Sequence, residues 1–263
     1  VAVREDGALL INGKPRFIAG ATHQSSRISH SPPIIAQLGL TGHRLTQGMK
    51  NEDMEKMWQD LGLYSLQAKP DPSIGGVESV VDMTEAQKKN LTTWVGRGGM
   101  KSVVSINTGG WESTIPNTAE ARAKHQALNE WIGKTTKRLT AWSSAGGFNA
   151  WTLPLFPYYD IVYGETEPWG PMDFDVILMP YMKRERKQPT TWVYLPQLYD
   201  NTPYERFRFE TYANILRGSV GFSMIQGIGD PTFTRGLAGE LRAIEEPLNS
   251  LEKAPAVTLE PNL

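Results

Sequence analysis

The sequence has no cysteine among its 263 residues. This absence excludes disulfides, thiolate nucleophiles, and zinc or iron–sulfur sites that use cysteine ligands. Histidine is scarce as well, with four residues. His30, His43 and His125 do not have the His-Glu-x-x-His spacing of a zinc-binding helix. We therefore expect no metal site and no cofactor.

An excess of charge of one sign is also missing, because 27 Lys+Arg face 28 Asp+Glu and the net charge is −1. This balance excludes nucleic-acid binding through a broad basic field, and we expect no nucleic-acid partner. The sequence contains no run of about 18 apolar residues, so we expect no membrane span. The hydrophobic fraction of 40% with 21% charged residues is typical of a globular domain.

What is present is an alternation of short apolar strands with amphipathic stretches. The eight predicted strands are residues 16–22, 42–47, 64–69, 101–107, 138–144, 160–165, 190–195 and 219–226. The predicted helices are residues 33–38, 51–62, 84–96, 119–136, 173–183, 204–217 and 237–251. Such alternation indicates a mostly parallel sheet, because parallel neighbours need a crossover connection.

Eight strand–helix repeats in about 245 residues are typical of a closed barrel. An open doubly wound sheet would carry a glycine-rich phosphate loop after an early strand. Here Gly96-Arg-Gly-Gly99 precedes a strand instead. We therefore predict an α/β fold, a (β/α)8 TIM barrel over residues 16–253. A short N-terminal β-hairpin over residues 1–15, with turns at Asp6-Gly7 and Asn12-Gly13, precedes it. A C-terminal tail over residues 254–263 follows.

In such a barrel the carboxyl ends of the strands line the active-site opening. The residues predicted there combine acids, other polar groups and indoles: Asp71, Glu165 and Glu167; His23, Arg44, Asn107 and Gln197; Trp111, Trp142 and Trp169. Carboxylate pairs act on glycosidic bonds, and indole faces stack on sugar rings. A phosphate ester would favour clustered Arg and Lys or a glycine loop at a helix N-terminus. The composition therefore points to carbohydrate as the partner.

Glu165 and Glu167 are two positions apart, so an extended backbone would point both to one side. Two close carboxylates could raise one pKa and create a general acid. The alternative is a solvated pair that binds neighbouring arginines. Asp71 is a candidate partner, although Pro70-Asp71-Pro72 is also typical of a turn. For each tryptophan the alternative is a packing role.

Five segments in order resemble one known family. They are Gly7 to His23, Leu38-Gly-Leu-Thr-Gly-His-Arg44, Asp60-Leu-Gly-Leu-Tyr64, Lys134 to Thr140, and Gly218-Ser-Val-Gly-Phe222. Together they resemble clan A glycoside hydrolases, the β-galactosidase-like group, over most of the chain. The resemblance implies a barrel that hydrolyses O-glycosyl bonds. It also implies that His23 and Arg44 lie around the catalytic centre.

Both catalytic glutamates of that family are unmatched. The resemblance implies an Asn-Glu pair at the end of the fourth strand, where this sequence has Asn107-Thr, and a Glu at the end of the seventh, where it has Gln197. We therefore expect a divergent glycoside hydrolase that uses Glu165, Glu167 or Asp71. The alternative is an inactive pseudo-glycosidase that binds carbohydrate or serves as a structural module. A third option is a barrel with a different reaction. We expect a secreted or periplasmic protein, with room for additional domains of a larger chain.

Overall fold

The computed structural model describes residues 1–5, 7–22, 32–44, 52–67, 84–96, 102–110, 118–144, 158–166, 191–196, 203–216, 218–224 and 230–250. Eight parallel strands form one sheet at its centre. They are β4 (Ile18–Thr22), β5 (Gly42–Arg44), β6 (Tyr64–Gln67), β7 (Ser105–Gly110), β8 (Leu139–Ser144), β9 (Ile161–Thr166), β10 (Thr191–Pro196) and β11 (Gly221–Met224). Their order in the sheet is β6-β5-β4-β11-β10-β9-β8-β7. All eight predicted strands are confirmed, and β7, β9 and β10 continue beyond their predicted ends.

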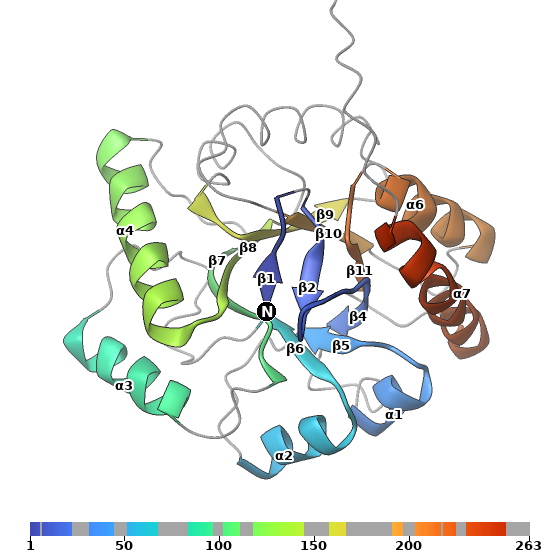
Figure 1. Cartoon of the computed structure of the whole chain (residues 1–263), viewed down its shortest axis with the longest axis horizontal. Helices are drawn as coiled ribbons and strands as arrows, with labels where there is room; N and C mark the ends of the chain where they lie inside the picture. The colour runs from blue at the N-terminus through green and yellow to red at the C-terminus, as the bar shows by residue number, and fades with distance from the viewer. Residues whose placement is uncertain are drawn as a thin grey trace, which may run out of the picture.

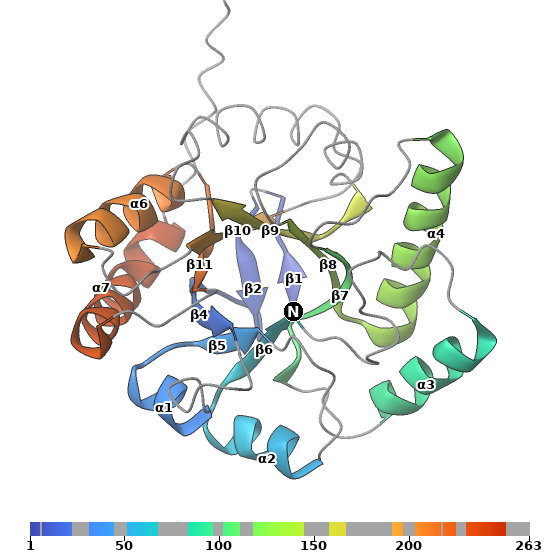
Figure 2. The same ribbon diagram turned by 180° about the vertical axis from the view of Figure 1, so that it is seen from behind.

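The helices surround this sheet (Figures 1 and 2). They are α1 (Pro32–Gln37), α2 (Glu52–Asp60), α3 (Glu85–Gly96), α4 (Ala119–Thr136), α6 (Tyr204–Leu216) and α7 (Pro231–Ser250). The helix predicted over 173–183 and the tail over 254–263 lie outside the described residues. In the part of the chain that the structure describes, none of the helices combines the length and the apolar character that crossing a bilayer requires.

Helix α7 begins earlier than the pattern of apolar residues predicts. The Asp230 carboxylate accepts a hydrogen bond from the Thr232 amide at 2.7 Å, and Pro231 occupies the first helical position. A capping acid followed by proline is a strong start signal, because proline has no amide to leave unsatisfied. The prediction that this helix starts at residue 237 was wrong, because it followed apolar spacing and missed the cap.

The two end strands of the sheet approach each other. Between β6 and β7 the described residues show one isolated parallel bridge, Ser65↔Val103, and a 2.8 Å hydrogen bond from the Val104 amide to the Ser65 carbonyl. The Tyr163 hydroxyl of β9 donates to the Leu66 carbonyl of β6 at 2.7 Å. The sheet is therefore strongly curved, with a single bridge in place of a continuous β6–β7 ladder. The closed barrel stays a prediction at this seam.

Strand alternation separates an outer core from an inner one. On the outer face, Ala19 and Phe222 belong to the cluster that packs against the helices. On the inner face, Leu66 fills the space beside two glycines. A Cβ atom at Gly20 would lie 2.5 Å from Leu66 Cδ1, and one at Gly42 would lie 2.9 Å from Leu66 Cγ. The Cβ atom at Gly42 would also lie 2.5 Å from the Tyr64 carbonyl oxygen. Gly42 is therefore required by the backbone of the neighbouring strand, and Gly20 allows the close approach of Leu66.

A small sheet closes the amino edge of the central one. Instead of one hairpin it has three antiparallel strands, β1 (Ala2–Val3), β2 (Leu9–Ile11) and β3 (Lys14–Pro15). The expected turn between β2 and β3 is confirmed, because Asn12 and Gly13 have φ angles of 54° and 76°. Leu9 and Ile11 are buried in the inner cluster with Ile18, Leu139 and Ile161, the first residues of β4, β8 and β9.

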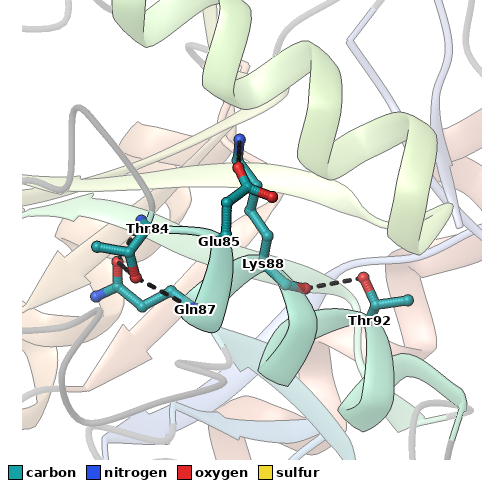
Figure 3. A network of polar contacts seen from close by, with 5 residues as sticks. All are labelled: Thr84, Glu85, Gln87, Lys88 and Thr92. Atoms are coloured by element: carbon teal, nitrogen blue, oxygen red, sulfur yellow. Dashed lines mark hydrogen bonds and ion pairs between the residues drawn. The ribbon is translucent and has the colours of Figure 1, made fainter.

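Helix α3 begins with a capping box formed by Thr84 and Gln87 (Figure 3). The Gln87 amide donates to Thr84 Oγ1 at 3.2 Å, and the Thr84 amide donates to Gln87 Oε1 at 2.8 Å. Thr118 caps α4 in a similar way by accepting from the Ala121 amide. Both helices follow the carboxyl end of a strand, so these caps stabilise chain segments that start on that side of the sheet.

Candidate functional site

The carboxyl ends of the strands meet at one edge, because the strands are parallel. Arg44, the last residue of β5, pairs in register with Thr22 of β4 and with Gln67 of β6. Glu165 of β9 pairs with Leu195 of β10, one position before each strand ends. The backbone therefore places these two predicted site residues at the same edge of the sheet, as the sequence pattern predicts.

The other predicted rim residues fall into two groups. Six of them lie outside the described residues: His23, Asp71, Trp111, Glu167, Trp169 and Gln197. Their roles stay predictions. The structure does describe the side chains of Asn107 and Trp142, and these two differ in their position.

Asn107 lies within β7, where it pairs with Ala141 of β8, and its side chain is buried. The register shifts directly after it, between Asn107 and Gly109. Such a bulge changes which face the following residues occupy. Asn107 is therefore part of the sheet wall below the carboxyl edge, and the bulge lies between it and that edge.

Trp142 lies on the outer face, in the core between the sheet and the helices. It is 1% exposed and belongs to the outer cluster. Its ring makes edge contacts with His125 of α4 and with Tyr159, at centroid distances of 6.0 and 5.3 Å. We therefore assign Trp142 to packing, the alternative that applied to each rim tryptophan.

His125 is buried in the same core, between the sheet and the helices. Its Nδ1 lies 3.0 Å from the Tyr159 hydroxyl, and its Nε2 has no hydrogen-bond partner in the part of the chain that the structure describes. Burial lowers the pKa of His125 to about 4, so the ring is neutral near pH 7. A neutral ring among Trp142 and Tyr159 on the helix side of the sheet serves the core rather than a ligand.

A half-buried acid lies at the opposite edge of the sheet from Glu165. Asp160 precedes β9, and its Oδ2 accepts from the Thr140 amide at 2.7 Å and from the Thr140 hydroxyl at 3.0 Å. Burial raises the pKa of Asp160, and the two Thr140 bonds oppose that rise. Although a shifted pKa can mark a catalytic acid, polar groups at the amino edge of such sheets serve stability.

The sequence interpretation missed polar groups on the inner face. The hydroxyls of Ser105 and Tyr163 both donate to the Leu66 carbonyl, the latter at 2.7 Å. The Ser223 hydroxyl is buried beside Gly20 and has no partner among the described residues. Strand alternation accounts for the position of Tyr163 and Ser223, because their preceding neighbours, Val162 and Phe222, face the helices. Among the described residues no group of three or more His, Asp or Glu could hold a metal ion.

Solved structures share this fold, although no model of a known family and no curated protein matches the sequence. A GH2 β-galacturonidase from Eisenbergiella tayi, bound to galacturonate, is 13% identical with a TM-score of 0.64, covering 97% of this chain and 55% of that chain. A β-glucuronidase from Bifidobacterium dentium, complexed with coumarin-3-O-glucuronide, is 13% identical with a TM-score of 0.63, covering 87% and 42%. The β-glucuronidase of Faecalibacterium prausnitzii is 13% identical with a TM-score of 0.61, covering 91% and 51%.

The chain therefore spans about half the length of these structures. At this identity the likeness shows the fold alone. The chain has an α/β fold like that of these glycoside hydrolases, and the resemblance noted in its sequence points to the same class.

Proposed function

We propose that the chain is a glycoside hydrolase-like (β/α)8 barrel that binds a carbohydrate at the carboxyl edge and hydrolyses a glycosidic bond with Glu165. The observation that carries this proposal is the register of β9, which puts Glu165 at that edge in a glycoside hydrolase-like fold. The Ser65↔Val103 bridge and the bond between Tyr163 and Leu66 support a closed ring of strands. The plug of Leu9 and Ile11 at the amino edge supports placing the ligand at the opposite one.

Glu165 is the preferred acid because of its position along β9. Ile161 and Tyr163 belong to the inner cluster, and strand alternation then predicts Glu165 on that same face, above Tyr163. Glycosidases use two carboxyl groups, and we propose Glu167 or Asp71 as the second. Carboxyl groups about 5 Å apart would give retention of configuration, and about 6.5–9.5 Å would give inversion.

Sugar contacts in this proposal come from the predicted rim residues His23, Arg44, Asn107, Trp111, Trp169 and Gln197. The polar groups would bind sugar hydroxyls, and the indoles would stack on the apolar faces of the rings. Trp142 has no part in it, because it lies in the outer core. Glycosidic hydrolysis by carboxyl groups needs no cofactor.

The test is hydrolysis of a panel of aryl glycosides, uronides included, and of natural polysaccharides. We expect Glu165→Gln to lower kcat about 10²- to 10⁴-fold, the usual contribution of a general acid or base, with an unchanged Tm. Glu120→Gln, at an exposed glutamate of α4, is the matched control and should leave kcat unchanged. Wild-type rates in Glu165→Gln would contradict the assignment.

A pseudo-glycosidase is the second candidate, and one observation favours it. β7 ends in Asn107-Thr-Gly-Gly110, without the acid that the family resemblance implies beside the asparagine. A domain of this kind would bind carbohydrate, or serve as a structural module, without turnover. Sugar binding that is weakened by Trp111→Ala or Trp169→Ala, together with no hydrolysis of any substrate, would favour it over the enzyme.

A further inference from the structure

Helices α6 and α7 lie side by side (Figures 1 and 2). An aromatic pair lies at their N-terminal ends, formed by half-buried Tyr204, which packs against the outer core, and exposed Phe233. The rings of Tyr204 and Phe233 are stacked, with centroids 4.5 Å apart and planes 20° apart. Phe233 is 47% exposed. Helix α6 follows β10 and α7 follows β11, so both helices begin on the side of the carboxyl edge. The pair therefore lies near the rim of the proposed site.

Hydrogen bonds hold the pair in place. The Tyr204 hydroxyl donates to Glu240 Oε1 at 3.4 Å, while Tyr212 and Arg208 donate to Glu240 Oε2, each at 2.8 Å. Burial raises the pKa of Glu240, but the bonds from Tyr212 and Arg208 outweigh it, so the carboxylate stays charged. Because Tyr204 is held at its hydroxyl and at its ring face, a ligand would find the surface already ordered.

Two glycines of α7 lie beside the aromatic pair. On α7, a Cβ atom at Gly236 would lie 3.9 Å from the Tyr204 hydroxyl, and one at Gly239 would meet nothing within 4 Å. Glycine at these helical positions costs stability relative to alanine. Here the two glycines leave the part of α7 next to Tyr204 without side chains.

The charges on this surface show no positive excess. The Arg208 guanidinium is paired with Glu240 and lies 5.1 Å from the centre of the Tyr212 ring. Near the starts of the two helices, exposed Glu205 and Asp230 add two negative charges and exposed Arg235 adds one positive charge. The surface thus offers flat aromatic faces and hydrogen-bonding groups without an excess of positive charge. This combination suits the apolar face and hydroxyls of an uncharged sugar rather than a uronate or a phosphate.

We propose that Tyr204 and Phe233 form an aromatic platform that binds an uncharged polysaccharide chain, separately from the carboxyl-edge site. The proposal rests on the proposed function only in taking carbohydrate as the ligand class. A chain held on the platform would extend toward the strand ends, since both helices begin on that side. A protein partner would instead use Phe209 and Leu216, which are 63% and 81% exposed on α6.

The experiment is native electrophoresis of the whole chain in gels that contain hydroxyethyl cellulose, xylan, galactomannan or polygalacturonate. We expect at least one uncharged polymer to retard the wild type, and Phe233→Ala to weaken binding about tenfold. Tyr204→Phe keeps the stacked ring and should weaken it less, about threefold, the scale of one lost hydrogen bond. Phe209→Ala is the matched control for Phe233→Ala. It removes a more exposed phenylalanine, on α6, and should bind like the wild type.

Four results would overturn the platform. They are no retardation by any uncharged polymer, retardation by polygalacturonate alone, equal binding of Phe233→Ala and wild type, and equal losses in Phe209→Ala and Phe233→Ala. Electrophoresis measures binding without turnover, so loss of the proposed hydrolysis leaves this measurement intact. Hydrolysis by a wild type that no uncharged polymer retards would overturn the platform alone.

Discussion

The two edges of the central sheet differ in how they are occupied. At the amino edge, Leu9 and Ile11 fill the inner space and Asp160 is bound to Thr140. At the carboxyl edge, the strand register brings Arg44 and Glu165 to the strand ends. The amino edge of the sheet is thus filled by apolar side chains, whereas the carboxyl edge has two of the predicted site residues at its strand ends. In parallel α/β barrels the carboxyl edge holds the active site and the amino edge serves stability.

The comparison also shows that a shifted pKa does not locate a site here. Asp160 has a raised pKa because it is buried, and His125 has one lowered to about 4. Asp160 lies at the filled edge, and His125 lies between α4 and the outer face of the sheet. Position in the fold, rather than the pKa shift, makes Glu165 the candidate.

The largest effect on stability should come from removing an apolar side chain at the amino edge of the sheet. Leu9→Ala removes a buried side chain from the inner cluster, and we expect it to lower the free energy of unfolding by about 2–5 kcal/mol, the usual cost of a core cavity. Urea unfolding followed by circular dichroism measures this loss. Leu10→Ala, at the half-buried neighbour on the same strand, should cost about 1 kcal/mol or less. Equal losses would mean that β2 does not plug the sheet.

The buried His125 should make the stability of the protein sensitive to acid. The pKa of His125 is about 4 in the folded protein, against 6.5 for a histidine in the unfolded chain, so the unfolded chain binds the proton first as the pH falls. The free energy of unfolding should therefore fall between pH 6.5 and 4, by up to about 3 kcal/mol, and should not change through this group above pH 6.5. His125→Gln should flatten that slope. A slope that persists in the variant would place the acid sensitivity elsewhere.

Substitutions at Asp160 and Glu165 should have opposite effects: the first should lower stability and leave kcat unchanged, and the second should lower kcat and leave stability unchanged. Asp160→Ala leaves the buried Thr140 amide without its acceptor, and we expect a loss of about 1–3 kcal/mol in the free energy of unfolding. Its kcat on any glycoside that the wild type hydrolyses should not change, in contrast to Glu165→Gln. Thermal unfolding and initial rates, measured on both variants, test the pair. A loss of kcat in folded Asp160→Ala would remove the distinction between the edges.

The smallest effect should come from the helix caps on the carboxyl side. Thr84→Ala removes the capping box of α3 (Figure 3), and we expect a loss of about 1 kcal/mol. Thr92→Ala, within the same helix, removes only a bond to the Lys88 carbonyl and is the control. Hydrogen exchange should show faster opening of the first turn of α3 in Thr84→Ala alone. A loss as large as that of Leu9→Ala would contradict the local role of this cap.

Local patterns predict much of this molecule. Predicted strands of six to eight residues correspond to all eight strands of the sheet, and the helix predicted over residues 84–96 corresponds to α3. The Asn12-Gly13 turn also follows from the sequence, because glycine and asparagine tolerate positive φ angles. The start of α7 could have been predicted as well, since Asp230 and Pro231 form a capping signal that apolar spacing does not register.

Local sequence determined where strands, turns and most helices begin and end, because those choices depend on neighbours a few positions away. Tertiary structure alone decided that Trp142 faces the helices, that Leu9 and Ile11 fill the amino edge, and that Phe233 stacks on Tyr204. An alternating pattern shows that two faces exist but not which one is inner. That assignment depends on contacts between residues far apart in the chain.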